Sequence, residues 1–339
     1  MVSDKILISV CIANFNGEEI LFECLDSIVR QVGDFSVEII VHDDCSTDGS
    51  LNLLHEVFPN VQVIVSKNNV GFCVANNRMV AAARGRYVLL LNNDAVLLQG
   101  ALQTLLAYAE SLGKQAILGL PQYAYGGGGL IDCGSDLDLF LNAVPNQHWR
   151  KGDVAVVIGA CFWINKELWH ELGGFPESFH ALAEDTYLCC RARLAGYPVR
   201  IAPGSGFLHR VGYSLGGGKA TAGELHTRVE RRRLTERNKT FALLACSPGV
   251  SFFFLLPIHL LMLCLEGGGV SLLTCRYKIW RDIYLACFKA LWRERRWLAR
   301  FRVETQCKRS CTLVDYFSVF RILPQKFRML MIYGFPRIS

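Results

Sequence analysis

Residues 5–17 read KILISVCIANFNG, an apolar run as long as a β-strand that stops at a polar turn. The next apolar residues recur at helical spacing, as Ile20, Leu21, Leu25, Ile28 and Val29. This pattern predicts a buried strand, a tight turn and then a helix that continues to Arg30.

The same pattern occurs twice more along the chain. Residues 37–41 (VEIIV) lead to the polar segment 43–50 (DDCSTDGS), in which Asp48 is expected to cap a helix. Residues 86–91 (RYVLLL) lead to Asn92-Asn93-Asp94. Such alternation predicts an α/β fold with a mostly parallel sheet, whose ligands bind beyond the carboxyl ends of the strands. Asn14, Asp43 and Asp94 should therefore share one crevice.

An acidic pair, Glu184-Asp185, follows the turn sequence Gly173-Gly174-Phe175. The residues after the pair have helical spacing, so the two carboxylates are expected in the first turn of a helix. An isolated acidic pair in that position usually only complements the positive end of the helix. The polar residues expected at the strand ends favour a functional role instead.

These segments together resemble a known family over roughly residues 6–215. The matching segments, in order, are Asn14-Phe15-Asn16-Gly17, 43–50, Asn69-Val70-Gly71-Phe72, Asn76-Asn77, Arg84-Gly85, 91–94, Gly159-Ala160, Gly173-Gly174-Phe175 and Glu184-Asp185. Each segment alone is a weak signal, but their order and spacing are specific. The chain resembles a family 2 glycosyltransferase with the Rossmann-like GT-A fold, of the rhamnosyltransferase-like type.

The resemblance implies an inverting transferase that uses a nucleoside-diphosphate sugar, with rhamnose or a related hexose as the sugar. It implies that Asp43 reads the base and that Asn14 lies in the turn around the nucleotide. The positions that the resemblance assigns to nucleotide binding are Asn14, Asn16, Asp43, Asn69, Gly71, Asn77 and Asn93.

The resemblance also implies a divalent metal site at Asn92-Asn93-Asp94. Only Asp94 is acidic here, whereas the family motif normally offers more negative charge, so Mg²⁺ or Mn²⁺ would need phosphate oxygens and water to complete its ligands. His209 corresponds to a family histidine that approaches the metal and the diphosphate. On this interpretation, replacing Asn93 by Asp should preserve or strengthen the metal site.

The catalytic roles follow from the chemistry of the reaction that the resemblance implies. An acceptor hydroxyl must lose its proton as the new bond forms, and a carboxylate general base contributes typically ~10²–10⁴-fold to such a rate. By resemblance Asp185 is that base, and Glu184 is expected to orient it or to bind the acceptor.

The charge of the chain is unevenly distributed. Residues 1–227 carry 15 Lys and Arg against 23 Asp and Glu, and residues 228–339 carry 21 against 7. This asymmetry predicts a catalytic domain over 1–227 and a basic, hydrophobic helical region over 228–339.

The second region raises the question of a membrane. From Thr240 to Leu265 no residue is charged at neutral pH apart from a possible His259, but Ser247-Pro248-Gly249 and Pro257 are expected to break the run into pieces too short to cross a bilayer. Further on, Trp280, Trp292, Trp297 and Phe301 alternate with arginines. That composition is typical of a helix in the membrane interface. A nucleic-acid partner is not expected, because no nucleic-acid-binding module accompanies the basic residues.

The same features predict the location and the partners of the protein. The first core strand begins within a few residues of Met1, with no secretory signal, and the 14 cysteines form no Cys-x-x-Cys motif and lie mostly in apolar runs. We therefore expect an enzyme that is peripheral on the cytoplasmic face of the membrane. The family resemblance adds a glycan or lipid-linked sugar as acceptor, in cell-surface polysaccharide assembly.

Two other functions remain open at this point. A nucleotidyltransferase would need a glycine-rich basic loop after the first strand, and residues 14–17 provide none. A catalytically weak nucleotide-sugar-binding or scaffold protein of the same fold is compatible with Asn92-Asn93, although the presence of Asp94 and Asp185 disfavours it.

Overall fold

The computed structural model describes residues 6–149, 152–210, 217–221, 224–334 and 337–338. The chain forms two compact units, which are described separately. Unit 1 comprises Met1–Ser135, Pro145–Ala192 and Tyr197–Val211, and unit 2 comprises Asp136–Val144, Arg193–Gly196 and Gly212–Ser339. Unit 2 thus includes two short earlier segments and begins its main part at Gly212, before the domain boundary that the sequence analysis placed after residue 227.

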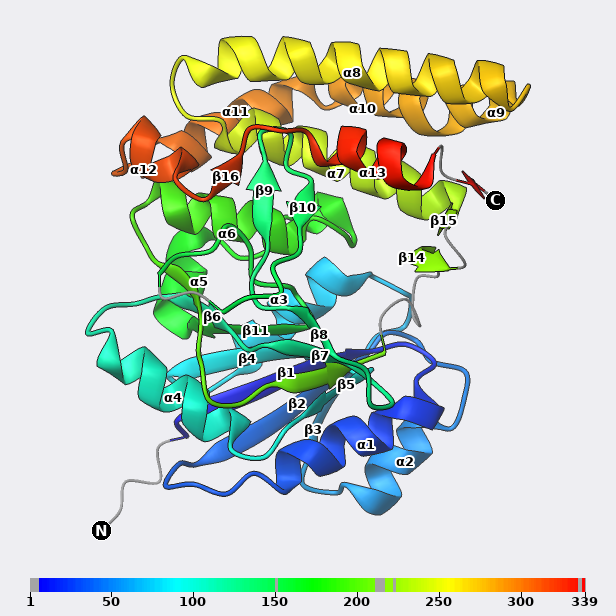
Figure 1. The fold of residues 1–339 in the computed structure, drawn as a ribbon. Coiled ribbons are helices and arrows are strands. Elements are labelled where there is room, and N and C mark those ends of the chain that lie inside the picture. Colours follow the sequence, from blue (N-terminus) through cyan, green and yellow to red (C-terminus); the bar gives the residue numbers. More distant parts are fainter. Residues whose placement is uncertain (1–5, 150–151, 211–216, 222–223, 335–336, 339) are drawn as a thin grey trace. The chain divides into compact units, whose positions relative to one another are not determined.

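Unit 1 is built around a seven-stranded sheet (Figure 1). The strand order is β12 (Val199–Ile201), β6 (Ile117–Gly119), β11 (Cys161–Asn165), β4 (Tyr87–Asn92), β1 (Ile8–Asn14), β2 (Val37–Asp43) and β3 (Gln62–Val65). Neighbouring strands are parallel except at β11, which is antiparallel to both β4 and β6. The predicted α/β sheet flanked by helices is therefore confirmed, and the sheet is mixed.

Six helices among the described residues of unit 1 follow its strands, and the sequence predicted α1, α2 and α6 among them. They are α1 (Glu18–Val29), α2 (Ser50–Val57), α3 (Phe72–Ala82), α4 (Ala101–Ser111), α5 (Lys166–Leu172) and α6 (Glu184–Leu194), with a 3₁₀ turn at Glu177–Phe179. Alternate residues of β1 and one face of α1 meet in the main hydrophobic core, which explains the apolar runs in the sequence. One detail of the prediction was wrong: α2 is preceded by Gly49, and Asp48 lies one residue earlier, where its Oδ1 accepts from the Ser50 N–H at 3.1 Å.

A smaller four-stranded sheet in unit 1 carries part of the site. Its order is β5 (Ala95–Leu97), β13 (Phe207–His209), β7 (Gln122–Ala124) and β8 (Leu130–Asp132). Strand β5 follows β4 after a two-residue turn, and His209 on β13 pairs with Ala95 of β5. This pairing brings residues more than 100 positions apart to the end of β4.

Unit 2 is mainly helical. Its helices are α7 (Val229–Cys246), α8 (Ser251–Leu273), α9 (Tyr277–Ile279) with a π-helical turn (Trp280–Tyr284), α10 (Leu285–Arg293), α11 (Arg295–Gln306), α12 (Leu313–Phe317) and α13 (Gln325–Tyr333). Two small sheets accompany them, β10 (Ala143–Val144), β9 (Asp136–Asp138) and β16 (Phe320–Arg321), and β14 (Gly217–Thr221), β15 (Glu224–Thr227) and β17 (Arg337–Ile338).

One expectation about unit 2 was wrong. Pro257 does not end the helix, since it lies inside the 23-residue helix α8. A proline removes only one backbone hydrogen bond, and the rest of the helix remains continuous. Helix α8 is thereby long and apolar enough to cross a membrane by length and composition. In α11, Phe301 is buried and stacks on the half-buried Trp297 with ring centroids 4.6 Å apart.

Candidate functional site

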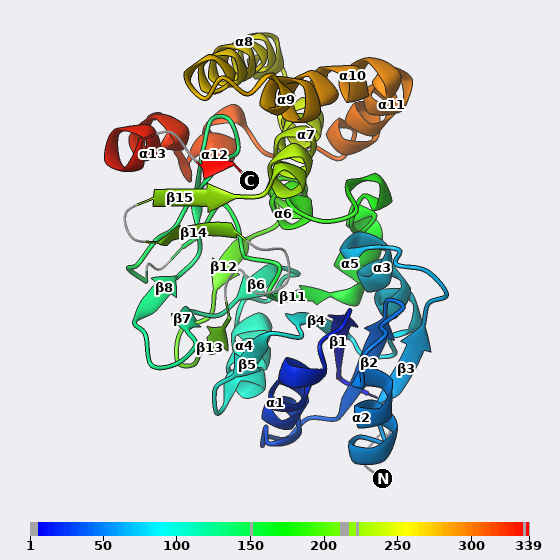
Figure 2. The same cartoon turned by 90° about the vertical axis from the view of Figure 1, so that its right-hand side faces the viewer.

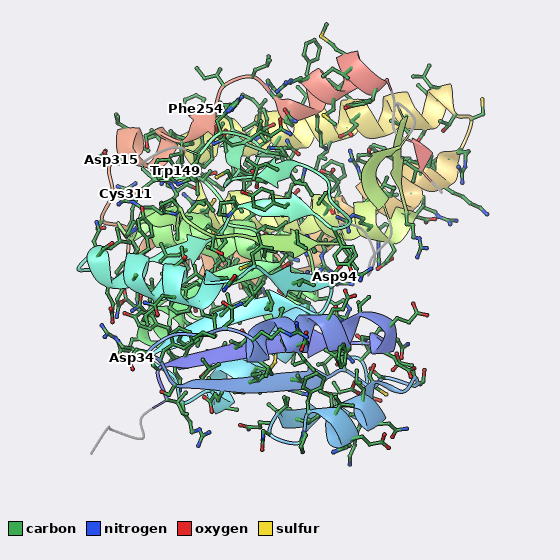
Figure 3. The ribbon with its side chains drawn as sticks, turned by 60° about the horizontal axis from the view of Figure 1, so that its bottom comes forward. Asp34, Asp94, Trp149, Phe254, Cys311 and Asp315 are labelled. Carbon is green, nitrogen blue, oxygen red and sulfur yellow. The ribbon has the colours of Figure 1, made fainter. Side chains whose placement is uncertain are left out.

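The predicted strand ends meet at one edge of the main sheet. Asn14 is paired in register with Asp43, and Ala13 with Asn92, so the last residues of β1, β2 and β4 are neighbours. The segments that follow these strands contain the polar side chains of the site. Asp94, labelled in Figure 3, lies just beyond the end of β4.

A hydrogen-bonded row of amides and a carboxylate crosses this edge. Asn14 donates from Nδ2 to Asp43 Oδ2 at 3.2 Å, and its Oδ1 accepts from Asn93 Nδ2 at 2.9 Å. The Ser46 N–H donates to the other oxygen of Asp43 at 3.0 Å. All three residues of the row are buried, so these bonds hold the side chains in one arrangement. The structure therefore brings together Asn14, Asp43 and Asn93 of the predicted nucleotide set.

Asn16 connects the turns after β1 and β2. Its backbone has φ +49°, a left-handed conformation that asparagine tolerates better than most residues. The Thr47 N–H donates to Asn16 Oδ1 at 2.8 Å, and the Asn16 N–H donates to Ser46 Oγ at 2.9 Å. Asn16 thus fixes the loop in which the base of a nucleotide would lie, according to the sequence prediction.

The other predicted nucleotide residues lie around α3. Asn69 is exposed, and Gly71 has φ +88° and packs so tightly that a Cβ would lie 2.1 Å from the His180 ring. Asp44, which the sequence did not single out, holds this loop by accepting from the Val70 and Gly71 N–H groups at 2.7 and 2.9 Å.

Asn77 uses its whole amide on the backbone of Phe175. Its Nδ2 donates to the Phe175 carbonyl at 2.9 Å, and its Oδ1 accepts from the Phe175 N–H at 3.1 Å. This geometry gives Asn77 a structural role at the Gly174-Phe175 turn. Its amide is occupied by the Phe175 backbone and is not proposed to bind the nucleotide.

Asp94 and His209 are adjacent. His209 Nε2 lies 3.1 Å from Asp94 Oδ1, and both side chains are buried. The opposite ring nitrogen, Nδ1, is 2.9 Å from Nε2 of the buried Gln122. Nothing in the sequence pointed to Gln122, because its proximity to His209 depends on the pairing of β7 with β13. Gln122 fixes the orientation of the histidine ring, as outer hydrogen-bond partners do for metal-binding histidines.

These side chains are suited to a divalent cation that takes its remaining ligands from the substrate and from water. Asn92 Oδ1 is buried and has no hydrogen-bond partner among the described residues, and the neighbour of the buried Asp94 Oδ1 is His209 Nε2 at 3.1 Å. Nor do the described residues contain a group of three or more His, Cys, Asp and Glu that could hold a metal. One carboxylate, one amide oxygen and one imidazole leave several positions for phosphate oxygens and water.

A second cluster is formed around Arg210, whose backbone is anchored to that of Asp94. The Arg210 N–H donates to the Asp94 carbonyl at 3.1 Å, and the Arg210 guanidinium lies 3.5 Å from the centre of the Tyr125 ring. Glu23 accepts from the Tyr125 hydroxyl and from Arg210, each at 2.6 Å. The bond from Tyr125 and that from Arg210 lower the pKa of Glu23, which keeps this carboxylate charged and Arg210 in place.

Asp185 lies in the first turn of α6, as predicted. Its Oδ2 accepts from the Gly159 N–H at 3.0 Å, and its Oδ1 accepts from the Thr186 N–H at 2.6 Å. Burial raises the pKa of Asp185 in spite of these bonds. Glu184 is also buried, and a Cβ on Gly159 would lie 3.5 Å from its Oε1 and 3.6 Å from Asp185 Oδ2. The two carboxylates therefore flank Gly159.

Residues 159–160 connect the acidic pair to the predicted metal motif. The Gly159 N–H binds Asp185, and the carbonyl of the next residue, Ala160, accepts from the Asn92 N–H at 3.0 Å. Asp185 and Asn92 are thus held by adjacent residues of the same segment. The structure joins the acidic pair and the ends of the parallel strands in one site.

The segment before α6 has an unusual backbone. His180, Leu182 and Ala183 have φ values of +64°, +72° and +66°, although none of them is glycine. Each left-handed non-glycine residue costs on the order of 1–3 kcal/mol, and such residues cluster at functional sites. Sequence reasoning missed this feature, because no Gly or Asn marks these positions.

Comparison with known proteins agrees with this geometry. Residues 9–173 match the model of the family described as Glycosyl transferase family 2. Glycosyltransferase GlyG of Streptococcus pneumoniae serotype 4 (strain ATCC BAA-334 / TIGR4) is 26% identical over 179 residues, 49% of this chain and 59% of the relative. Succinoglycan biosynthesis protein ExoO of Rhizobium meliloti (strain 1021) is 29% identical over 109 residues, 32% of this chain and 31% of the relative.

These matches cover less than two thirds of either relative's length. A solved structure, GalNAc-T7 with UDP, GalNAc and Mn²⁺, superposes on 72% of this chain and 48% of its own, with a TM-score of 0.56 and 17% identity. That likeness concerns the fold. Residues 9–173 are thus similar to family 2 glycosyltransferases, and the fold is GT-A-like.

Proposed function

We propose that this protein transfers a sugar from a nucleoside-diphosphate sugar to a hydroxyl group of a glycan or lipid-linked acceptor, with inversion at the anomeric carbon. The observation that carries the proposal is the segment Gly159-Ala160, which binds Asp185 through one residue and Asn92 through the next. The proposed general base, Asp185, therefore lies close to the residues at the end of β4 that would bind the diphosphate. The rhamnosyltransferase-like resemblance favours rhamnose or a related hexose as the sugar.

The nucleotide would lie beyond β1 and β2. Asn14, Asn16 and Asp43 are held by the hydrogen bonds described above, so the pocket for the base needs little rearrangement on binding. Asn69 and Gly71 border the same side, and Asn93 orients Asn14. Arg210 is joined to Asp94 through its backbone, and its guanidinium is paired with Glu23.

Asp94 and His209 would hold a divalent cation, Mg²⁺ or Mn²⁺, with Asn92 Oδ1 as a further oxygen. When bound, such an ion offsets negative charge on a departing diphosphate. Gln122 keeps the His209 ring directed at Asp94, and the solved structure of GalNAc-T7 contains Mn²⁺ with UDP. These observations support metal dependence.

Asp185 would remove the proton from the acceptor hydroxyl. A carboxylate whose pKa is raised by burial is a stronger base than an exposed aspartate. The hydrogen bonds from Gly159 and Thr186 fix its two oxygens, and the left-handed segment before α6 fixes its backbone. Glu184, beside the same glycine, would orient the acceptor or Asp185.

The proposed location is the cytoplasmic side of a membrane, where the protein would be peripheral. Nucleotide sugars are made in the cytoplasm, and the basic residues after position 228 suit an anionic lipid surface.

The direct test is release of nucleoside diphosphate from dTDP-, UDP- and GDP-sugars, with and without Mn²⁺. We expect slow release from one nucleotide class and faster release with metal. Binding of a nucleotide sugar without release or transfer under any condition would favour the scaffold alternative. Absence of both binding and release would overturn the proposal.

A further inference from the structure

Helix α8 has two different faces. Its outer face consists of Phe254, Ile258, Leu261, Leu265 and Leu272, spaced at three, four or seven residues, with side chains 67%, 48%, 58%, 67% and 80% exposed. This face contains no charged residue over five turns. His259, Leu263, Gly267 and Val270 form the inner face and are buried.

The inner face is held by polar contacts to other parts of unit 2. Glu266 pairs with Arg232 of α7 and, at 2.6 Å, with Lys326 of α13. His259 Nε2 lies 2.8 Å from Thr240 Oγ1 on α7. A Cβ on Gly267 would lie 2.5 Å from the Tyr284 ring, so the helix is closely packed there. These contacts fix which face of α8 points outward.

Figures 1 and 2 show the result for unit 2. Among its described helices, α7, α10 and α13 lie toward one side of α8, and none covers the other side. Phe254, on the uncovered side, is labelled in Figure 3. An apolar strip of this length on a helix of about 34 Å requires an apolar partner.

The contacts of α8 are incompatible with a membrane crossing. Between Val229 and Lys239, the part of α7 that pairs with Glu266 and approaches His259, seven of eleven residues are charged. A crossing by α8 would draw these residues into hydrocarbon, where charged groups are very unfavourable. A helix lying along the surface keeps them in water.

We propose that α8 lies flat in the surface of an anionic lipid bilayer, with the strip Phe254–Leu272 inserted among the lipid chains. The charge of the C-terminal region favours lipid over a second copy of this chain. Residues 228–339 carry 21 basic against 7 acidic residues, so two such surfaces would repel each other, while anionic headgroups would attract them. Arg276 and Lys278, just beyond the end of α8, are exposed and suited to headgroup contact.

This assignment moves the lipid contact away from the Trp- and Arg-rich helices. Leu298 and Phe301 of α11 are buried, and Trp297 packs on Phe241 of α7 with ring centroids 5.9 Å apart. Trp292 is the exposed member of that group, and Arg295 stacks on it at 4.5 Å. Of the aromatic residues predicted to meet the membrane, Phe301 is thus buried, Trp280 and Trp297 are half-buried, and Trp292 is exposed.

The test is sedimentation of the full-length protein with vesicles of phosphatidylcholine alone or mixed with phosphatidylglycerol. We expect binding to the mixed vesicles that weakens with salt, and at least about tenfold weaker binding for the double variant Leu261→Glu/Leu265→Glu. The matched control is Val32→Glu/Val57→Glu, which adds the same charge at two exposed aliphatic residues of unit 1 and should bind like wild type. Circular dichroism checks that both variants are folded.

Three outcomes would overturn the proposal. One is equal binding by the two double variants. Another is no vesicle binding together with self-association that Leu261→Glu/Leu265→Glu abolishes, which would assign the strip to a second copy of the chain. The third concerns Cys307, which is exposed and follows α8 in the chain. In protein added to preformed vesicles it should react with a membrane-impermeant maleimide, whereas reaction only after detergent would indicate a crossing.

Discussion

At the scale of single residues, the environment of Asp185 is the most informative part of the site. Both its oxygens accept backbone N–H groups, and burial still raises its pKa. Asp185→Asn should therefore retain donor binding and lose transfer by at least ~10²-fold, because it removes the base without removing a nucleotide contact. Nucleotide affinity by calorimetry and turnover with acceptor distinguish these effects. Near-normal turnover in the variant would refute the role.

The raised pKa also sets the direction of the pH dependence. Transfer requires unprotonated Asp185, so kcat should fall with decreasing pH through the raised pKa, at higher pH than the ordinary value of 3.8. The raised pKa of Asp185 also affects folding stability, and this effect changes with pH in the direction opposite to that of kcat. A carboxyl group with a raised pKa in the folded state favours folding when protonated, and this contribution is lost as pH rises. A kcat profile without an acid limb above pH 3.8 would contradict the assignment.

The structure changes the expectation for the metal motif. Asn93 donates to Asn14 Oδ1, so Asn93→Asp would place two oxygen acceptors together and should weaken nucleotide binding. Asn92→Asp is the better gain-of-charge variant, because Asn92 Oδ1 is buried and has no hydrogen-bond partner among the described residues. Asp94→Ala should abolish the Mn²⁺-dependent part of nucleotide affinity. Titrations with and without Mn²⁺ test all three, and unchanged affinity in Asp94→Ala would place any metal elsewhere.

At the scale of secondary-structure elements, α7 and α8 are joined by ionisable groups that are buried. Although burial opposes ionisation, Lys239, Lys326 and Arg232 keep the pKa of Glu236 well below its usual value. Burial lowers the pKa of His259 to about 3, so the imidazole is neutral in the folded protein. Breaking one member of such a buried cluster leaves the others uncompensated.

This arrangement predicts acid sensitivity of the α7–α8 pair. Between pH 6.5 and 3 the unfolded chain protonates His259 and the folded chain does not, so stability should fall with pH by up to about 1.4 kcal/mol per unit. His259→Gln keeps an amide donor for Thr240 and removes the titration. Between pH 6.5 and 5, peptides from α7 and α8 should therefore lose less hydrogen-exchange protection in this variant than in the wild-type protein. Identical losses would show that His259 does not govern the effect.

The elements show which parts of the structure the sequence could predict. Strands β1, β2 and β4 were predictable, because each is a buried apolar run ending in a polar turn. The proximity of Asn14, Asp43 and Asp94 followed from the parallel arrangement of these strands alone. Gln122 and the partners of Glu266 could not be predicted, since these contacts join residues 34 to 87 positions apart. The outward strip of α8 was missed because Pro257 suggested a break.

At the scale of the whole molecule, the two units are interleaved along the chain. Asp136–Val144 and Arg193–Gly196 belong to unit 2, although unit 1 contains the residues on both sides of them. Asp136 pairs with Arg321 at 3.0 Å, and Asp138 accepts from the Gln325 N–H at 2.7 Å. A fragment of residues 1–227 would therefore lose the partners of β9.

We expect that fragment to be less stable than a self-contained catalytic domain. Buried Asp138 and Arg193 would each lose hydrogen bonds to residues beyond 227, and losing a hydrogen bond to a buried charged group costs on the order of 1–3 kcal/mol. Thermal unfolding and proteolysis of the fragment, compared with the full chain, measure the loss. A fragment as resistant as the full chain would show that residues 136–144 fold without the C-terminal helices.

The left-handed segment His180–Ala183 has a consequence for protein engineering. Glycine at Leu182 or Ala183 would relieve backbone strain, and a screen for heat resistance would select it. The same replacement would loosen the chain immediately before Glu184 and Asp185, where a displacement of about 1 Å can cost ~10²-fold in rate. Selection for heat resistance and selection for turnover would thus favour different amino acids at these two positions.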